Sequence, residues 1–160
     1  MNTRNTVRML SLALLLALGG LPARAQQAAQ PPCPSPDEIQ PQQLYGLWRF
    51  SLWPEGGSEA APSASGSVLL GRHPEYPGSV RGELLRNSAS GGPPAQVAGD
   101  VTDGEFNLDE SADGVSMDAV WTGLPHDCGQ TIRGVRRPAE GRPDATGPLQ
   151  FLLQKTPGWR

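Results

Sequence analysis

Three residues that could do chemistry stand side by side at His126-Asp127-Cys128. A histidine and a cysteine can hold zinc or form a nucleophilic pair. Zinc needs three or four ligands, however, and we expect Cys128 to be oxidised. The second histidine, His73, has no partner nearby in sequence, and no Gly-x-Ser-x-Gly motif marks a serine nucleophile. The sequence therefore predicts no enzymatic activity, no metal site and no cofactor.

A long acidic stretch is the second candidate for chemistry. Between Asn87 and Ile132 there is no lysine or arginine, and the acidic residues are Asp100, Asp103, Glu105, Asp109, Glu110, Asp113, Asp118 and Asp127. Their oxygens could bind Ca²⁺, but the spacing fits no EF-hand loop. Instead, Glu105, Asn107 and Asp109 recur at every second residue, which is typical of the solvated face of a strand. We expect a structural role for these residues.

Arginines flank this acidic stretch on both sides. They are Arg72, Arg81 and Arg86 before it and Arg133, Arg136 and Arg137 after it. Alternating regions of opposite charge could orient a charged partner, although interspersed surface charge also serves solubility.

The first 25 residues predict where the protein works. Arg4 and Arg8 precede an apolar run over 9–18, and Ala23-Arg24-Ala25 is a small-x-small cleavage motif. This pattern indicates a secretory signal peptide over 1–25, and the apolar run is too short for a permanent membrane span. The mature chain would be a soluble periplasmic or secreted protein. Its ten basic and 16 acidic residues give a formal charge of −6, which disfavours nucleic acid as a partner.

Cys33 and Cys128 are the two cysteines of the chain. In an oxidising compartment they would most simply form one disulfide. A lipid on Cys33 and an intermolecular disulfide are the alternatives. Gln30-Pro31-Pro32 before Cys33 lacks the small apolar residues expected at a lipid attachment site.

The mature chain divides into an arm, a strand-rich domain and a tail. Residues 26–43 form a Pro/Gln-rich arm, in which Ser35-Pro36-Asp37-Glu38 predicts a short helical turn limited by Pro41. Residues 44–156 alternate apolar and polar side chains in segments bounded by turn residues. The predicted strands cover 44–53, 67–72, 79–86, 95–102, 105–109, 115–122, 128–137 and 149–155. Residues 157–160 form the tail.

The turns between these strands favour an antiparallel meander. Asp103-Gly104 predicts a type I′ hairpin, because both central residues of that turn need positive φ. Residues 111–114 predict a second turn. The sequence therefore predicts an all-β fold, an eight-stranded antiparallel up-and-down barrel, since closure removes the free edges of such a sheet. A β-sandwich is the alternative, because the loop over 54–66 could cross between two sheets.

One face of the predicted strands is apolar and should point inward. It comprises Trp48, Phe50, Val80, Leu84, Val97, Phe106, Leu108, Met117, Trp121, Phe151 and Leu153. These residues could be plain core. Gly46, Gly82, Gly99 and Gly134 fall on the same phase, and glycines there would either bend the strands or leave volume for a ligand. We therefore expect Trp48, Phe50, Trp121, Gly46 and Gly82 to contact a ligand, should the interior hold one.

Gly46-Leu47-Trp48 at the start of the first strand, preceded by a short capped turn, resembles the start of calycin barrels. The resemblance covers about residues 35–155 and is closest to avidin-like barrels and to bacterial inhibitors of metalloproteases. It implies a secreted binding protein of the calycin type that holds a small hydrophobic ligand in the barrel. The alternative that it implies is a periplasmic protease inhibitor, or another module that binds an extracytoplasmic protein through the N-terminal arm and the 54–66 loop.

Overall fold

The computed structural model describes residues 32–88, 92–142 and 147–159. The predicted signal peptide and the first residues of the predicted arm lie outside these ranges. The strands are β1 (Gly46–Pro54), β2 (Ala64–Arg72), β3 (Val80–Arg86), β4 (Ala95–Thr102), β5 (Glu105–Ser111), β6 (Ala119–His126), β7 (Thr131–Pro138) and β8 (Leu149–Lys155).

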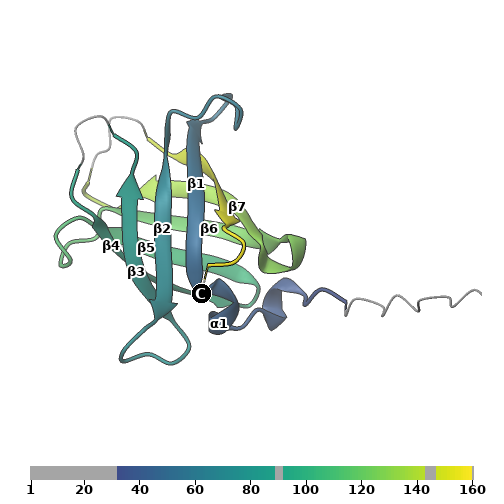
Figure 1. Ribbon diagram of the computed structural model, residues 1–160. Helices are drawn as coiled ribbons and strands as arrows, with labels where there is room; N and C mark the ends of the chain where they lie inside the picture. The colour runs from purple at the N-terminus through teal and green to yellow at the C-terminus, as the bar shows by residue number, and fades with distance from the viewer. Residues whose placement is uncertain (1–31, 89–91, 143–146, 160) are drawn as a thin grey trace, which may run out of the picture. The chain divides into compact units, whose positions relative to one another are not determined.

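The strands form one closed antiparallel barrel. Each strand pairs with the next along the chain, and β1 also pairs with β8, so that Trp48 lies opposite Lys155 and Pro54 opposite Leu149. Figure 1 shows β1, β2 and β3 standing upright in front of β6 and β7, which cross behind them. The predicted eight-stranded up-and-down barrel is confirmed, and the β-sandwich alternative is wrong. Closure leaves no unpaired strand edge on the barrel.

The hairpin between β4 and β5 has the predicted turn. Asp103 has a φ of 50° and Gly104 a φ of 81°, so both central residues lie in the left-handed region. Paired residues on either side, Thr102 with Glu105 and Val101 with Phe106, continue the ladder from the turn. A two-residue turn of this kind fixes the register of the two strands.

The start of β6 differs from the prediction. The sequence predicts a strand from Val115 with Met117 facing inward, but β6 begins at Ala119, Met117 is exposed, and Val115 is 90% exposed. The reason is local hydrogen bonding by Asp113, whose Oδ1 accepts from the backbone N–H groups of Val115 and Ser116 at 2.8 and 2.7 Å. These bonds hold residues 113–116 in a turn and keep them out of the sheet.

The barrel interior is filled by apolar side chains. Phe50 contacts Trp121 edge to face at a centroid distance of 5.5 Å, and the Trp121 ring lies 5.1 Å from that of Phe151. The other members of the core include Val68, Leu70, Val80, Leu84, Val97, Phe106, Leu108, Ile132 and Leu153, all buried. Except for Met117, the predicted inward residues are buried.

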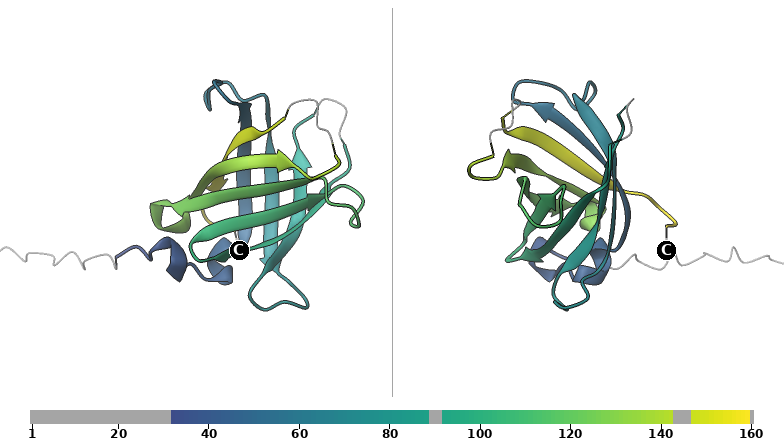
Figure 2. Two further views of the ribbon diagram at one scale, coloured as in Figure 1. Left: turned by 180° about the vertical axis from the view of Figure 1, so that it is seen from behind. Right: turned by 90° about the vertical axis from the view of Figure 1, so that its left-hand side faces the viewer.

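Two short helical turns close one end of the barrel. Pro36–Glu38 (η1) and Pro41–Leu44 (α1) bring Ile39 and Leu44 into the core, so the predicted turn is followed by a second one that begins at Pro41. Figure 2 shows these turns at the end of the barrel opposite the connection between β1 and β2. We call residues 33–44 the cap. No helix in the described ranges is long and apolar enough to cross a membrane.

Three interactions attach the cap to the barrel. Trp48 Nε1 donates a hydrogen bond to the Leu44 carbonyl oxygen at 2.8 Å. The Lys155 ammonium donates to the Gln43 carbonyl oxygen and lies 5.5 Å from the centre of the Trp48 ring. The predicted disulfide is present and joins Cys33 to Cys128, in the short helical turn η2 (Asp127–Gly129) between β6 and β7.

Candidate functional site

The structure places the predicted ligand contacts in different surroundings. Trp48, Phe50 and Trp121 lie inside the barrel with at most 2% of their surface exposed. Phe50 and Trp121 contact each other, whereas Trp48 is bound to the cap. Gly46 lies at the first position of β1, where its φ of 123° favours glycine and where Trp159 and Lys155 are its neighbours. The structure thus does not gather these residues around one open space.

Three of the inward glycines, Gly82, Gly99 and Gly134, leave no room for a side chain, which favours a bend of the strand over volume for a ligand, the two possibilities that the sequence left open. A Cβ atom added to Gly82 would collide with the carbonyl oxygen of Leu69 on β2. A Cβ atom added to Gly99 would likewise collide with the carbonyl oxygen of Asn107, and one added to Gly134 with that of Thr122. Glycine is needed at these points because the neighbouring backbone comes too close for any side chain, as happens where barrel strands bend.

A hollow of about 380 Å³ lies at the end of the barrel opposite the cap. We call this hollow the mouth; it is lined by Leu52, Ser63, Ala64, Arg86, Glu110, Ala112, Asp118, Arg136 and Leu149. The lining residues come from the end of β1, β3, β5 and β7, from the start of β2 and β8, and from the turn between β5 and β6. The volume is within the range of small-molecule sites, about 300–1,000 Å³.

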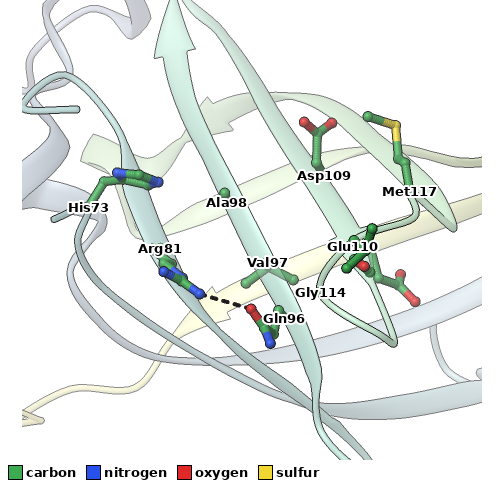
Figure 3. A pocket seen from close by; sticks show the side chains of 11 residues that line it. His73, Arg81, Gln96, Val97, Ala98, Asp109, Glu110, Gly114 and Met117 are labelled. Carbon is green, nitrogen blue, oxygen red and sulfur yellow. Dashed lines mark hydrogen bonds between the residues drawn. The ribbon is translucent and has the colours of Figure 1, made fainter. Parts of the chain in front are cut away.

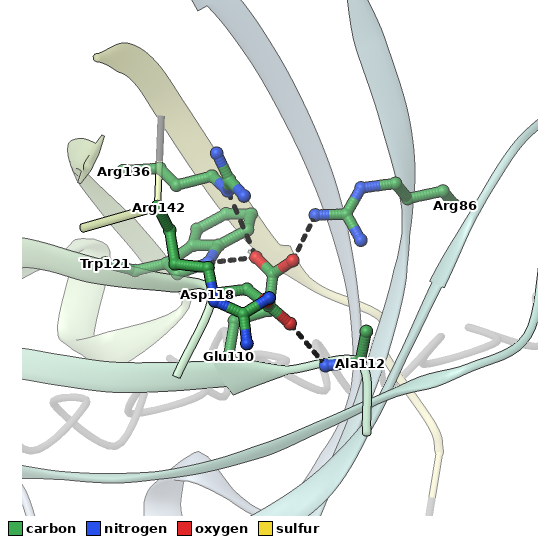
Figure 4. A network of polar contacts seen from close by, with 7 residues as sticks. All are labelled: Arg86, Glu110, Ala112, Asp118, Trp121, Arg136 and Arg142. Atoms are coloured by element: carbon green, nitrogen blue, oxygen red, sulfur yellow. Dashed lines mark hydrogen bonds and ion pairs between the residues drawn. The ribbon is translucent and has the colours of Figure 1, made fainter. Parts of the chain in front are cut away.

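A buried carboxylate lies at the side of the mouth. Glu110 Oε2 accepts hydrogen bonds from Trp121 Nε1 at 2.9 Å and from Arg136 Nε at 3.0 Å. Glu110 Oε1 accepts from Arg86 Nη2 at 2.6 Å. Figure 4 shows Arg86 and Arg136 approaching the carboxylate from opposite sides. Glu110 and Arg136 are both buried, so these bonds replace water around the two charges.

The arginines keep Glu110 ionised. Burial raises the pKa of the Glu110 carboxyl, but the hydrogen bond and charge of Arg136, the charge of Arg86 and the hydrogen bond from Trp121 together outweigh that effect. The pKa therefore lies below the ordinary value for a glutamate. Glu110 is thus a charged acceptor that fixes the position of its donors. This environment does not favour the protonated form that a general acid needs at neutral pH.

A second ion pair lies at the rim of the mouth. Asp118 Oδ1 is 3.0 Å from Arg142 Nη1, and Asp118 Oδ2 accepts from the Ala112 backbone N–H at 2.6 Å. The two carboxylates of the mouth, Glu110 and Asp118, therefore both have donors on each oxygen. Arg86 differs, because its side chain is 37% exposed while it remains bonded to Glu110.

The role of Glu110 differs from the expectation of a merely structural acidic stretch. The predicted strand ends at Asp109, but β5 continues to Ser111, and Glu110 points inward in phase with Phe106 and Leu108. The signal was in the sequence, since the same two-residue alternation extends by one further step. Arg136 likewise follows Ile132 in phase on β7 and lies inside.

A second groove, of about 290 Å³, lies over β3, β4 and β5 on the outer wall of the barrel and shares Glu110 with the mouth (Figure 3). Arg81 Nη2 donates to Gln96 Oε1 at 2.9 Å on its floor. Burial, together with the charge of Asp100, raises the pKa of the Asp109 carboxyl there. Among the described residues, no three histidine, cysteine, aspartate or glutamate side chains gather in an arrangement that could hold a metal ion.

The segment His126-Asp127-Cys128 does not hold a nucleophilic histidine–cysteine pair. The Cys128 sulfur is bonded to Cys33, and Asp127 Oδ2 accepts a hydrogen bond from Thr131 Oγ1 at 2.7 Å. The segment is a tight turn in which Asp127 and Cys128 both have positive φ.

Comparisons with known proteins support the fold. The sequence matches no protein-family model and no curated protein. Among solved structures, the chain is similar to EF1p2_mFAP2b bound to DFHBI, at 16% identity and a TM-score of 0.51 over 72% of this chain and 95% of that chain. A second solved structure, from the de novo design of a fluorescence-activating β-barrel, has 20% identity and a TM-score of 0.44 over 72% and 96%. The first of these likenesses supports the eight-stranded barrel fold; kinship with calycins, avidins or protease inhibitors stays a prediction.

Proposed function

We propose that the chain is a non-enzymatic binding protein, working in the periplasm or outside the cell, that takes a small, partly apolar molecule at the mouth of its barrel. The observation that carries this proposal is the hollow itself. It has Leu52 and Leu149 as apolar lining, and Arg86 and Glu110 as fixed polar groups on its wall. A few well-placed polar groups on an otherwise apolar concave surface are typical of small-molecule sites.

The mouth is a better place for a ligand than the centre of the barrel. Trp48, Phe50 and Trp121 are packed by their neighbours, so a ligand at their level would have to displace core side chains. Trp121 nevertheless reports on the mouth, because its indole N–H is bonded to Glu110. A barrel of this fold, EF1p2_mFAP2b, is bound to DFHBI, which agrees with a ligand-binding use of such barrels.

The test is a titration of the purified protein with the neutral apolar dye N-phenyl-1-naphthylamine, followed by dye fluorescence and by tryptophan emission. We expect saturable binding that Ala64→Phe abolishes, because Ala64 faces the mouth and a phenyl ring would fill it. Ala98→Phe, on the outer wall over β4, is the matched control and should bind the dye like the wild type. Absence of saturable binding, or binding that survives Ala64→Phe, would contradict the proposal.

Protein binding through the N-terminal arm and the 54–66 loop remains the alternative function. The structure limits how an arm could act, because residues 33–44 form the cap, with Ile39 and Leu44 in the core and Cys33 bonded to Cys128. An arm that enters a partner would therefore have to consist of residues before Cys33.

A further inference from the structure

The charged side chains around the mouth differ in how far they reach into it. The Glu110 and Arg136 side chains are buried and bonded to each other, whereas Arg86 has about a third of its surface exposed. Arg86 lies in the inward phase of β3, two residues after Leu84, and is the last residue of that strand. Its guanidinium group is bonded to the buried Glu110 carboxylate (Figure 4), and Arg86 also lines the hollow.

The carboxylate oxygens of the mouth are already engaged, whereas Arg86 has donors beyond the one that it gives to Glu110. Both oxygens of Glu110 and both oxygens of Asp118 accept hydrogen bonds or pair with an arginine. An arginine carries five N–H donors in a fixed planar arrangement, and Arg86 gives one nitrogen, Nη2, to Glu110. A ligand that enters the mouth thus meets a positive group with further donors, next to carboxylates whose charge is balanced.

We propose that Arg86 binds an anionic group of the ligand and that the apolar part of the same molecule lies against Leu52 and Leu149. The ligand class is a small amphipathic organic anion, a carboxylate or sulfonate with an apolar body. This inference rests on the proposed function, since it names the chemistry of the molecule held at the mouth. Glu110 acts as a positioning residue, because its bond to Arg86 fixes the guanidinium group before the ligand arrives.

The pairing fits the chemistry of both groups. Guanidinium and carboxylate or sulfonate groups form charge-assisted hydrogen bonds, often through two parallel N–H donors. Because Arg86 is partly exposed, salt should screen the attraction, so the contribution of the anionic group should fall as ionic strength rises. Asp118 does not oppose the anion strongly, because Arg142 and the Ala112 N–H neutralise it.

The experiment compares two dyes that differ only in a sulfonate group. 1-anilinonaphthalene-8-sulfonate carries the anion, and N-phenyl-1-naphthylamine is the same ring system without it. Dissociation constants of both dyes are measured for the wild type, for Arg86→Gln, which keeps an amide donor but loses the charge, and for Arg86→Lys, which keeps the charge. Arg81→Gln is the matched control, because Arg81 lies on the outer face of the same strand.

We expect Arg86→Gln to weaken binding of the sulfonate dye relative to the neutral dye by about tenfold, the loss of one charge-assisted hydrogen bond. Arg86→Lys should restore most of the preference, and Arg81→Gln should not alter it. Circular dichroism verifies that each variant is folded, and Arg86→Lys serves as the informative variant should Arg86→Gln unfold. In that case the preference of Arg86→Lys for the sulfonate dye over the neutral dye should disappear in high salt. A preference that does not change with salt overturns the inference.

Failure of this inference differs from failure of the proposed function. A ratio of the two dissociation constants that stays unchanged in Arg86→Gln overturns the role of Arg86, even though both dyes still bind and Ala64→Phe still blocks them. If neither dye binds the wild type, the proposed function itself is overturned, and the inference falls with it.

Discussion

Burial of Glu110 removes a carboxylate from water, and three side-chain donors replace the lost hydration. Two of them, Trp121 and Arg136, are themselves buried, and the third, Arg86, reaches the solvent side of the mouth. Removing one partner of such a network takes an ion pair away from a buried charge, which is more costly than losing a surface ion pair. The chain therefore depends on Glu110 for stability as well as for the position of Arg86.

Glu110→Gln should lower the free energy of unfolding by about 3 kcal/mol at neutral pH, because the buried Arg136 would lose its ion pair with the Glu110 carboxylate. Urea unfolding followed by tryptophan fluorescence measures the loss. The matched control is Glu59→Gln, which removes the exposed pair of Glu59 with Arg133 and should cost less than about 1 kcal/mol. Equal effects of the two substitutions would contradict this account of the network.

The same comparison has a pH dependence with a definite sign. The pKa of Glu110 is lower in the folded chain than its ordinary value of 4.5, so its stabilising contribution is complete above pH 4.5. The contribution is lost as the pH falls through the lower folded value. The difference in unfolding free energy between wild type and Glu110→Gln should therefore shrink in acid, and a difference that grows below pH 4.5 would show that Glu110 is not held ionised.

The inward direction of Glu110 was accessible from sequence, but its partners were not. The alternation of Phe106, Leu108 and Glu110 already puts the carboxylate inside the barrel. That Arg86 and Arg136 meet it depends on the register of β3, β5 and β7 across a closed barrel, which no local pattern specifies. From sequence alone, a charged residue in the apolar phase of a strand indicates that the strand ends there. In this chain the charged residue Glu110 instead belongs to a buried network.

At the scale of single elements, the alternating pattern located the strands well and their ends less well. β8 begins and ends at the predicted residues, whereas β2 begins at Ala64, three residues before the predicted start. The larger error, at the start of β6, came from Asp113, whose side chain captures the backbone N–H groups of Val115 and Ser116. Apolar alternation cannot reveal such local competition for backbone donors.

The bends of the strands depend on glycine, and Gly82 offers a direct test. Gly82→Ala would place a methyl group against the Leu69 carbonyl oxygen and should lower the free energy of unfolding by about 2 kcal/mol or more. Gly78→Ala is the matched control, since a Cβ atom there meets nothing within 4 Å, and its effect should stay within about 0.5 kcal/mol. Chemical denaturation of both variants measures the difference. A tolerated Gly82→Ala would mean that β2 and β3 can separate at little cost.

At the scale of the whole molecule, the two ends of the barrel have different tasks. The cap at one end is attached by the disulfide and by Trp48 and Lys155. The mouth at the other end has the charged network and the hollow. Between them lies the packed core of Phe50, Trp121 and Phe151. Stability of the cap and binding at the mouth should therefore be separable.

The double variant Cys33→Ser/Cys128→Ser tests this separation. The disulfide closes a sequence separation of 95 residues, so its loss should lower the free energy of unfolding by about 4 kcal/mol. Binding of N-phenyl-1-naphthylamine should stay within about twofold of the wild type, because distant sites contribute independently. Both measurements use samples whose far-ultraviolet circular dichroism matches the wild type. If the folded variant loses the dye, the ligand contacts the cap, and the assignment of the binding site to the mouth is wrong.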